Sequence, residues 1–299
     1  MSKIVKFLAH EGKVCVVCCD TTDLVENARK IHDLTPTTTA VLGRVLTIAS
    51  MMGVTSIKEV GDKITIQING KGPVGQIVAI TNLEEQNKVV VKGYVQCKNV
   101  ELPLNEIGKI DVGGAVGTDG YLNIIKQMNM SNQNYNGLVP LITGEIAEDF
   151  TEYFVKSEQK PTALALGVLV NKDGVKTSGG YVINLMPDAT PDVIDKVEKA
   201  LENSSGISRM LDFGLSLEEI AKRVTGDENV VLIEDNIEAY YKCDCSKDKI
   251  ERGIISLGEN EIKDIIETDE KANIKCQFCN KEYDFSREDL ENILKKIKE

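Results

Sequence analysis

The stretch Cys243-Asp244-Cys245, followed thirty residues later by Cys276-Gln277-Phe278-Cys279, decides how the C-terminal part of this chain folds. Two close cysteine pairs separated by a foldable insert suit a tetrahedral four-thiolate zinc site, because each pair spans one edge of the tetrahedron. The first pair has one intervening residue, whereas ordinary zinc knuckles have two. We therefore expect these four cysteines to bind one zinc ion in the reduced protein.

Lysines surround these cysteines in the sequence: Lys242, Lys247, Lys249, Lys275 and Lys281. Nearby lysines lower thiol pKa values, which raises the thiolate fraction that binds metal and reacts with oxidants. A site that only staples a small domain together remains an alternative, because most four-cysteine zinc sites are purely structural.

Composition limits the classes of function. The 299 residues allow one large domain and one or two small ones. The first residues lead directly into a strand pattern, and no apolar run is long enough to cross a membrane, so we expect no signal peptide and a cytoplasmic protein. Cysteines stay reduced there, so eight of them favour metal or redox chemistry over a disulfide framework.

Two further features of the composition argue against other functions. The net charge of −12 speaks against nucleic-acid binding. The only histidines are His10 and His32, both expected to be structural, and no acid–base pair or nucleophile constellation stands out. We therefore expect a protein that is not an enzyme.

The pattern over residues 1–187 predicts an α+β core domain with a mixed sheet and a few helices. Residues 4–10 and 13–19 read as a hairpin, and Thr35-Pro36 caps a long apolar helix. The glycine-rich stretches at 70–75 and 113–117 lack a dinucleotide or P-loop fingerprint and are expected to be turns between strands. Four other cysteines are expected to be buried small hydrophobes, namely Cys15, Cys18, Cys19 and Cys97.

Residues 188–228 change in character and predict a helical linker. Thr190-Pro191 opens one short helix, and Ser216 with Glu219 forms a capping box for another. Such short helices are marginal in water, so they must pack on a neighbour. This makes the linker a candidate switch element, with an ordinary helical connector as the alternative.

Residues 229–299 form the predicted zinc-binding domain, which is densely charged and has few large apolar residues. Structural zinc supplies about 10–16 kcal/mol in small zinc peptides, and a whole domain has a net stability of only about 5–15 kcal/mol. This domain should therefore unfold without its metal. Oxidation of the thiolates would remove the metal and so convert a chemical event into local unfolding.

The cysteine pattern resembles that of the heat shock protein 33 family of redox-regulated holdase chaperones. Further segments fit that family: Gly43-Arg44, Gly72-Pro73-Val74-Gly75, Ser157-Glu158-Gln159, Gly179-Gly180-Tyr181, Leu257-Gly258 with Glu261-Ile262, and residues 278–285. The resemblance spans nearly the whole chain, and the cysteine spacing is its most specific part. Cys15, Cys18, Cys19 and Cys97 have no role in the family pattern.

The resemblance implies an ATP-independent chaperone that is inactive when reduced and zinc-bound. Oxidation would join Cys243 to Cys245 and Cys276 to Cys279, expel zinc and unfold the C-terminal domain and linker. By position, Cys276 and Cys279 would be the first oxidant-sensing pair. The resemblance also implies unfolding client proteins, a homodimer on activation, and hand-over to downstream ATP-dependent folding chaperones, with no role for nucleic acid or membrane.

Two other functions remain open from the residues. One is a structural zinc module that docks a protein or nucleic-acid partner. The other is a thiol–disulfide oxidoreductase, which would need an exposed low-pKa cysteine pair on a thioredoxin-like βαβ pattern that the core does not supply.

Overall fold

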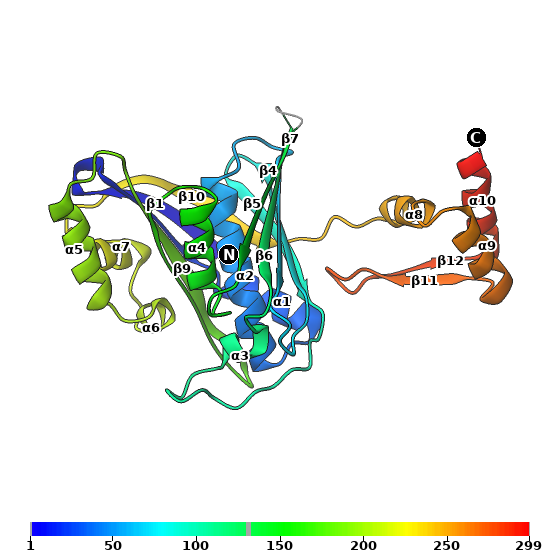
Figure 1. Ribbon diagram of the computed structural model, residues 1–299, viewed down its shortest axis with the longest axis horizontal. Coiled ribbons are helices and arrows are strands. Elements are labelled where there is room, and N and C mark those ends of the chain that lie inside the picture. The colour runs from blue at the N-terminus through cyan, green and yellow to red at the C-terminus, as the bar shows by residue number, and fades with distance from the viewer. Residues whose placement is uncertain (1, 130–132, 299) are drawn as a thin grey trace. The chain divides into compact units, whose positions relative to one another are not determined.

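The computed structural model describes residues 2–129 and 133–298 (Figure 1). The chain divides into two compact units, residues 1–242 and residues 243–299. Each unit has its own buried core, so the two are described in turn.

A ten-stranded sheet forms the frame of the first unit, in the order β7-β6-β3-β4-β5-β10-β1-β2-β9-β8. Its strands are β1 (Ser2–Ala9), β2 (Val14–Asp20), β3 (Lys63–Asn69), β4 (Ile77–Glu85), β5 (Lys88–Val95), β6 (Tyr121–Met128), β7 (Gln133–Pro140), β8 (Thr162–Asn171), β9 (Gly174–Leu185) and β10 (Val231–Tyr241). Neighbouring strands are antiparallel except β5 and β10, which are parallel. The predicted hairpin of β1 and β2 is confirmed, with the short 3-10 helix η1 (His10–Gly12) at its turn.

The helix α2 (Pro36–Thr55) is the centre of the main core. Thr35 caps it as predicted, with its hydroxyl accepting a hydrogen bond from the backbone of Thr38. The helix is long and apolar enough to cross a membrane, but nearly all of it is buried inside the unit, against β4, β5, β8 and β9. A helix that is apolar on all sides needs such burial. Several of its buried hydroxyls donate to carbonyls of the preceding turn, as where Thr47 donates to Gly43 and Ser50 donates to Leu46.

Three other helices complete this layer: α1 (Thr22–His32), α3 (Val112–Val116) and α4 (Ala147–Lys156). The predicted glycine-rich turn at 70–75 is indeed the loop between β3 and β4, whereas residues 113–117 instead include the short helix α3. The two stretches pack together so closely that a Cβ on Gly70 would lie 2.1 Å from the carbonyl oxygen of Gly117. Glycine is required at this close approach of two backbones.

The predicted helical linker forms a second layer on the opposite side of the sheet. It consists of α5 (Pro191–Glu202), α6 (Ile207–Asp212) and α7 (Leu217–Thr225). Pro191 opens α5 as predicted, although Thr190 makes no capping hydrogen bond, and Ser216 forms the predicted capping box of α7. Buried side chains such as Val197, Met210 and Val224 pack against the β1–β2–β9 face. These short helices therefore obtain their stability from the sheet.

The boundary between the units differs from the one expected at residue 228. Residues 231–241 form β10, which lies between β5 and β1 inside the large sheet. The expected C-terminal domain of 229–299 thus begins only at Cys243. The strand was missed because its polar residues, among them Glu234 and Asp235, hide the alternation typical of a strand.

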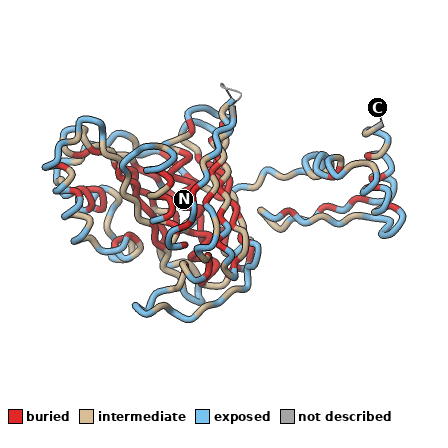
Figure 2. Tube along the Cα trace, viewed as in Figure 1, coloured by how far each residue is buried: buried red, intermediate tan, exposed pale blue. Residues whose placement is uncertain are grey.

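The second unit is small and has little core. It contains α8 (Lys247–Ile255), α9 (Glu259–Thr268), a hairpin of β11 (Ala272–Lys275) and β12 (Glu282–Phe285), and α10 (Arg287–Lys298). Its buried residues are Ile254, Ile262, Ile266, Cys276, Tyr283, Phe285, Leu290 and Ile293. Figure 2 shows how sparsely buried positions occur along this unit. So small a core gives marginal stability unless another interaction supports it.

Candidate metal centre

The four cysteines of the second unit come from two separate turns. Cys243 and Cys245 lie in the extended segment between β10 and α8, whereas Cys276 and Cys279 lie in the turn that joins β11 to β12. Backbone hydrogen bonds hold this second turn closed, because the N–H of Asn280 donates to the carbonyl of Cys276 at 2.8 Å. Asn280 has a φ of 60°, a left-handed conformation that asparagine tolerates well.

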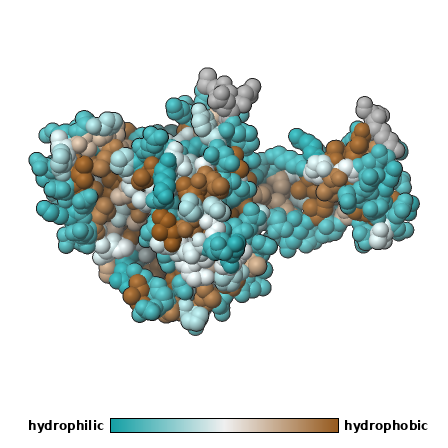
Figure 3. All heavy atoms as spheres, in the orientation of Figure 1, coloured by the Kyte–Doolittle hydropathy of each residue, from teal (hydrophilic) through white to brown (hydrophobic). Residues whose placement is uncertain are grey.

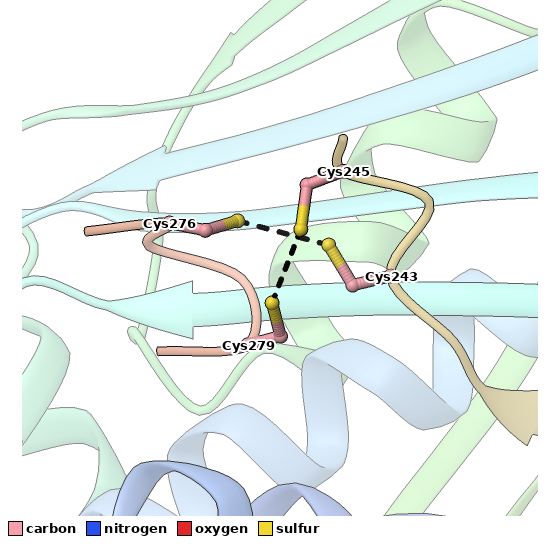
Figure 4. Close-up of side chains that lie close together, drawn as sticks. All are labelled: Cys243, Cys245, Cys276 and Cys279. Atoms are coloured by element: carbon pink, nitrogen blue, oxygen red, sulfur yellow. Dashed lines mark hydrogen bonds between the residues drawn. The ribbon is translucent and has the colours of Figure 1, made fainter. Parts of the chain in front are cut away.

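The structure brings all four sulfurs together (Figure 4), each within 4.8 Å of the others. The Sγ atoms of Cys243 and Cys276 are 3.7 Å apart, and those of Cys245 and Cys279 are 3.4 Å apart. Both of these contacts join a cysteine of one pair to a cysteine of the other. The predicted convergence of Cys243, Cys245, Cys276 and Cys279 is present in the fold.

This donor set fits a tetrahedral metal ion. A tetrahedral ion with metal–sulfur bonds of about 2.3 Å separates its sulfur ligands by about 3.8 Å, close to the distances seen here. All four cysteines are free thiols, and Cys276 is buried while the other three are half-buried. Four soft sulfur donors with no carboxylate or imidazole among them favour a soft or borderline metal ion over calcium or magnesium. The four cysteines can hold a metal ion.

Burial and hydrogen bonds shift the pKa values of Cys243, Cys245 and Cys279 in different directions. Burial favours the neutral form of Cys245, but hydrogen bonds from the Tyr283 hydroxyl and the neighbouring thiols outweigh it and lower the pKa to about 7. Burial raises the pKa of Cys243, although the backbone N–H of Cys245 opposes it. Burial likewise raises the pKa of Cys279, against a backbone hydrogen bond from Lys281.

Tyr283 is a site residue that cysteine spacing could not identify. Its hydroxyl lies 3.1 Å from the Sγ of Cys245, and its ring is buried in the core of this unit. The position on β12, four residues after Cys279, places its side chain against the sulfurs. Donors outside the ligand set orient ligands and stabilise their charge.

The lysines near the cysteines in sequence mostly pair with other groups. Lys249 forms an ion pair with Asp244, Lys247 lies 3.3 Å from Asp289, and Lys242 pairs with Glu84 on β4. Lys281 lies 5.2 Å from the ring centre of Tyr283. Three of the five lysines that lie near the cysteines in sequence thus pair with carboxylates, which are more numerous than basic residues in this chain.

The remaining cysteines lie in the first unit. Cys18 and Cys19 are fully buried as predicted, and burial raises the pKa of Cys19 to about 12. Cys15 is only half-buried, and Cys97 is exposed, so the prediction of burial is wrong for Cys97. Cys97 follows the end of β5 at Val95, where the chain leaves the sheet, and therefore has no strand neighbours to cover it.

Both histidines have structural roles, as expected. His10 forms a hydrogen bond with the carbonyl of Thr225 at 2.8 Å. His32 is the last residue of α1 and is buried against Tyr241, with 2.8 Å between its Nε2 and the tyrosine hydroxyl.

Comparison with known proteins gives a consistent result over the whole chain. Residues 2–286 match the family model described as Hsp33 protein. The chain is 41% identical over 293 residues to a 33 kDa chaperonin of Thermoanaerobacter sp. (strain X514), covering 98% of this chain and 97% of the relative. It is 40% identical over 294 residues to a 33 kDa chaperonin of Bacillus velezensis, covering 98% of each. The crystal structure of the 33 kDa chaperonin of Thermotoga maritima is similar with a TM-score of 0.86 and 33% identity, covering 99% of each chain.

Proposed function

This chain belongs to the Hsp33 family, and we propose that it is an ATP-independent holdase chaperone whose activity is switched on by oxidation. As a chaperone of this family it binds unfolding client proteins and limits their aggregation. The observation that carries the redox proposal is the convergence of four sulfurs within 4.8 Å in a unit with a very small core.

In the reduced protein, Cys243, Cys245, Cys276 and Cys279 would hold zinc. Zinc, when bound, would supply the free energy that the small core lacks, on the order of 10 kcal/mol. Tyr283 would support the thiolate form of Cys245 through its hydroxyl. In this state we expect the second unit to be folded and the chaperone to be inactive.

Oxidation would act on the cysteine sulfurs. For each pair, two thiols and one molecule of peroxide give one disulfide and two molecules of water. One sulfur attacks a peroxide oxygen, the O–O bond breaks and water leaves, and the second sulfur then displaces a second water from the sulfenic acid. Hypochlorous acid would do the same and leave chloride and water. We propose disulfides between Cys243 and Cys245 and between Cys276 and Cys279.

Loss of the thiolates would remove the support of the second unit, because disulfide sulfurs are poor metal ligands. Release of the helical linker, residues 188–228, would then uncover apolar residues of the sheet such as Phe7, Val16 and Tyr181. The first unit also exposes large apolar side chains, among them Phe213 and Leu232. Figure 3 shows apolar patches on one face of this unit. Both surfaces are candidates for client binding.

We further propose that the active form is a homodimer in the cytoplasm that passes clients to ATP-dependent folding chaperones. The proposed activity is binding without turnover, so no residue is assigned a catalytic role. A protein that acted as an oxidoreductase would instead catalyse repeated reduction of insulin disulfides.

The decisive experiment measures three quantities in parallel during oxidation with peroxide at elevated temperature. These are metal release to a chromogenic chelator, protease cleavage after residue 242, and suppression of aggregation of a thermally unfolding client. We expect the three to rise together and to reverse on reduction with added zinc. Equal suppression by the reduced, metal-loaded protein would refute the switch.

A further inference from the structure

The first unit contains a cavity of about 730 Å³ that the metal centre does not involve. It lies between the C-terminal ends of α2 and α4 and the strands β1, β2 and β9. Its apolar wall consists of Val54, Phe154, Val182, Leu185, Met186 and Ile194. Its volume falls within the range of about 300–1,000 Å³ typical of small-molecule sites.

The cavity exists because two helices end before the sheet does. The helix α2 stops at Thr55 and α4 stops at Lys156, so neither covers the adjoining ends of β2 and β9. Gln159, which has a left-handed φ of 55°, lies in the short connection that leads from α4 back into the sheet at β8. Apolar side chains of the sheet are thus left facing an open space, and Met186 at its edge is 39% exposed.

The charged residues along this cavity are opposite in sign to the net charge of the chain. The protein carries a net charge of −12, yet the charged residues described along the cavity wall are two lysines, Lys6 and Lys160. Lys160 is partly neutralised, since its Nζ lies 3.4 Å from an oxygen of Glu158. Lys6 has no ion pair among the described residues, although Glu234 lies opposite it on β10. Lys6 is therefore the cation left to meet a ligand.

We propose that this cavity binds a single-chain anionic amphiphile, a medium- or long-chain carboxylate, with its alkyl chain against Phe154 and Ile194 and its carboxylate at Lys6. An apolar wall with a cation on one side suits this class of ligand, because the alkyl chain would pack on the wall and the carboxylate would pair with the ammonium group. Each methylene that leaves water should raise the affinity about fourfold until the apolar wall is covered.

The alkylation rates of two cysteines can report whether the cavity is occupied. Cys15 lines the cavity, whereas Cys97 is exposed and does not. The rate of alkylation of each can be followed by mass spectrometry in the same reduced, metal-loaded full-length protein. The probes are octanoate, decanoate and dodecanoate, each below its micelle concentration. We expect these carboxylates to slow alkylation of Cys15, with an effect that saturates as their concentration rises. The apparent affinity should increase with chain length, and the alkylation rate of Cys97 should not change.

The charge contribution is tested by decanol, which has the same chain without the carboxylate, and by two matched variants. Lys6→Met keeps an apolar stem and removes the charge. It should therefore weaken the binding of decanoate at least tenfold and leave the binding of decanol unchanged. Lys3→Met is the control, since Lys3 is an exposed residue of the same strand. Ala189→Phe places a ring in the cavity from its lining and should abolish protection while leaving the unfolding temperature unchanged.

Equal protection by decanol and decanoate in the unaltered protein would overturn the assignment of an anionic ligand. Unchanged alkylation of Cys15 at the highest soluble concentration, or equal slowing of Cys15 and Cys97, would overturn the site itself. None of these measurements involves oxidation or client aggregation, so the result is independent of the proposed chaperone switch.

Discussion

The hydroxyl of Tyr283 donates a hydrogen bond to the sulfur of Cys245 across 3.1 Å. This bond links β12 of the second hairpin to the turn that carries the first cysteine pair, two segments far apart in the sequence. The same bond stabilises negative charge on the sulfur of Cys245. The hydrogen bonds to the other three sulfurs come from backbone N–H groups and from neighbouring thiols. The tyrosine is thus both a core residue and a partner of the metal centre.

Replacement of Tyr283 with phenylalanine should weaken metal binding about 10- to 100-fold, the usual effect of losing a hydrogen bond to a ligand. The ring remains, so the core of the unit stays filled. Competition with a chelator of known affinity measures the change. Tyr240→Phe is the matched control, because its hydroxyl bonds to Glu84 in the first unit. An unchanged affinity for Y283F would show that the bond does not support the thiolate.

Replacement of Cys276 with serine should weaken metal binding strongly and make the second unit sensitive to protease without any oxidant. A serine hydroxyl is a poor substitute for a thiolate, and Cys276 is the buried member of the set. Limited proteolysis of the reduced variant tests this. Cys97→Ser, at an exposed position outside the unit, should behave like the unaltered protein.

Disulfide mapping after oxidation should find Cys243 joined to Cys245 and Cys276 joined to Cys279. In the folded unit, sulfur contacts of 3.7 and 3.4 Å run between the pairs. Once the unit opens, however, closing a loop of one or two residues costs far less entropy than closing one of thirty. Peptide mapping under non-reducing conditions decides the matter. A predominance of Cys245 joined to Cys279 would mean that oxidation happens inside the folded unit.

Replacement of Phe285 with alanine should destabilise the second unit by about 3–5 kcal/mol, the cost of deleting a large buried aromatic side chain. Phe285 is 1% exposed and is one of few large residues in that core. Metal release should then occur at a lower denaturant concentration, whereas the concentration that unfolds the first unit should not change. Tryptic cleavage within each unit reports the two transitions separately, and a simultaneous shift of both would contradict their independence.

The ion pair of Glu26 and Arg29 should make the first unit sensitive to acid. The hydrogen bond from Arg29, together with the backbone N–H of Val175, lowers the pKa of Glu26 to about 2 in spite of its partial burial. Its stabilisation is complete above the ordinary glutamate pKa of about 4.3 and is lost as the pH falls towards 2.

The free energy of unfolding should therefore fall less between about pH 4.3 and about pH 2 in Glu26→Gln than in the unaltered protein. The expected difference is only about 1 kcal/mol, because solvent screens this pair. Denaturant unfolding at a series of pH values measures it. Glu11→Gln is the control, since Glu11 is 92% exposed and lies 3.9 Å from its lysine. Identical pH profiles for E26Q and the unaltered protein would show that the pair does not stabilise the fold.

Local sequence signals predicted much of the structure. The caps at Thr35 and Ser216 and the alternating β1–β2 hairpin all appear where they were expected. The convergence of the four cysteines also followed from spacing alone, because two close pairs of thiols have few ways to share one ion. These features depend on residues near one another in the chain or on very specific chemistry.

Long-range features could not be predicted in the same way. The strand β10 owes its existence to partners more than 140 residues away on β5 and more than 220 away on β1, and polar residues interrupt its own apolar pattern. The exposure of Cys97 and the position of Tyr283 against Cys245 likewise depend on tertiary packing. A one-dimensional pattern contains no information on which distant segment will cover a given residue.

The place of β10 in the sheet also affects how the protein emerges from the ribosome. A nascent chain released up to residue 228 has β1 and β5 without the strand that joins them, so two interior edges of the sheet stay unpaired. Closure has to wait until residue 241 has left the exit tunnel, two residues before the first of the four clustered thiols. Completion of the large unit is thus followed at once by the appearance of the first two metal ligands.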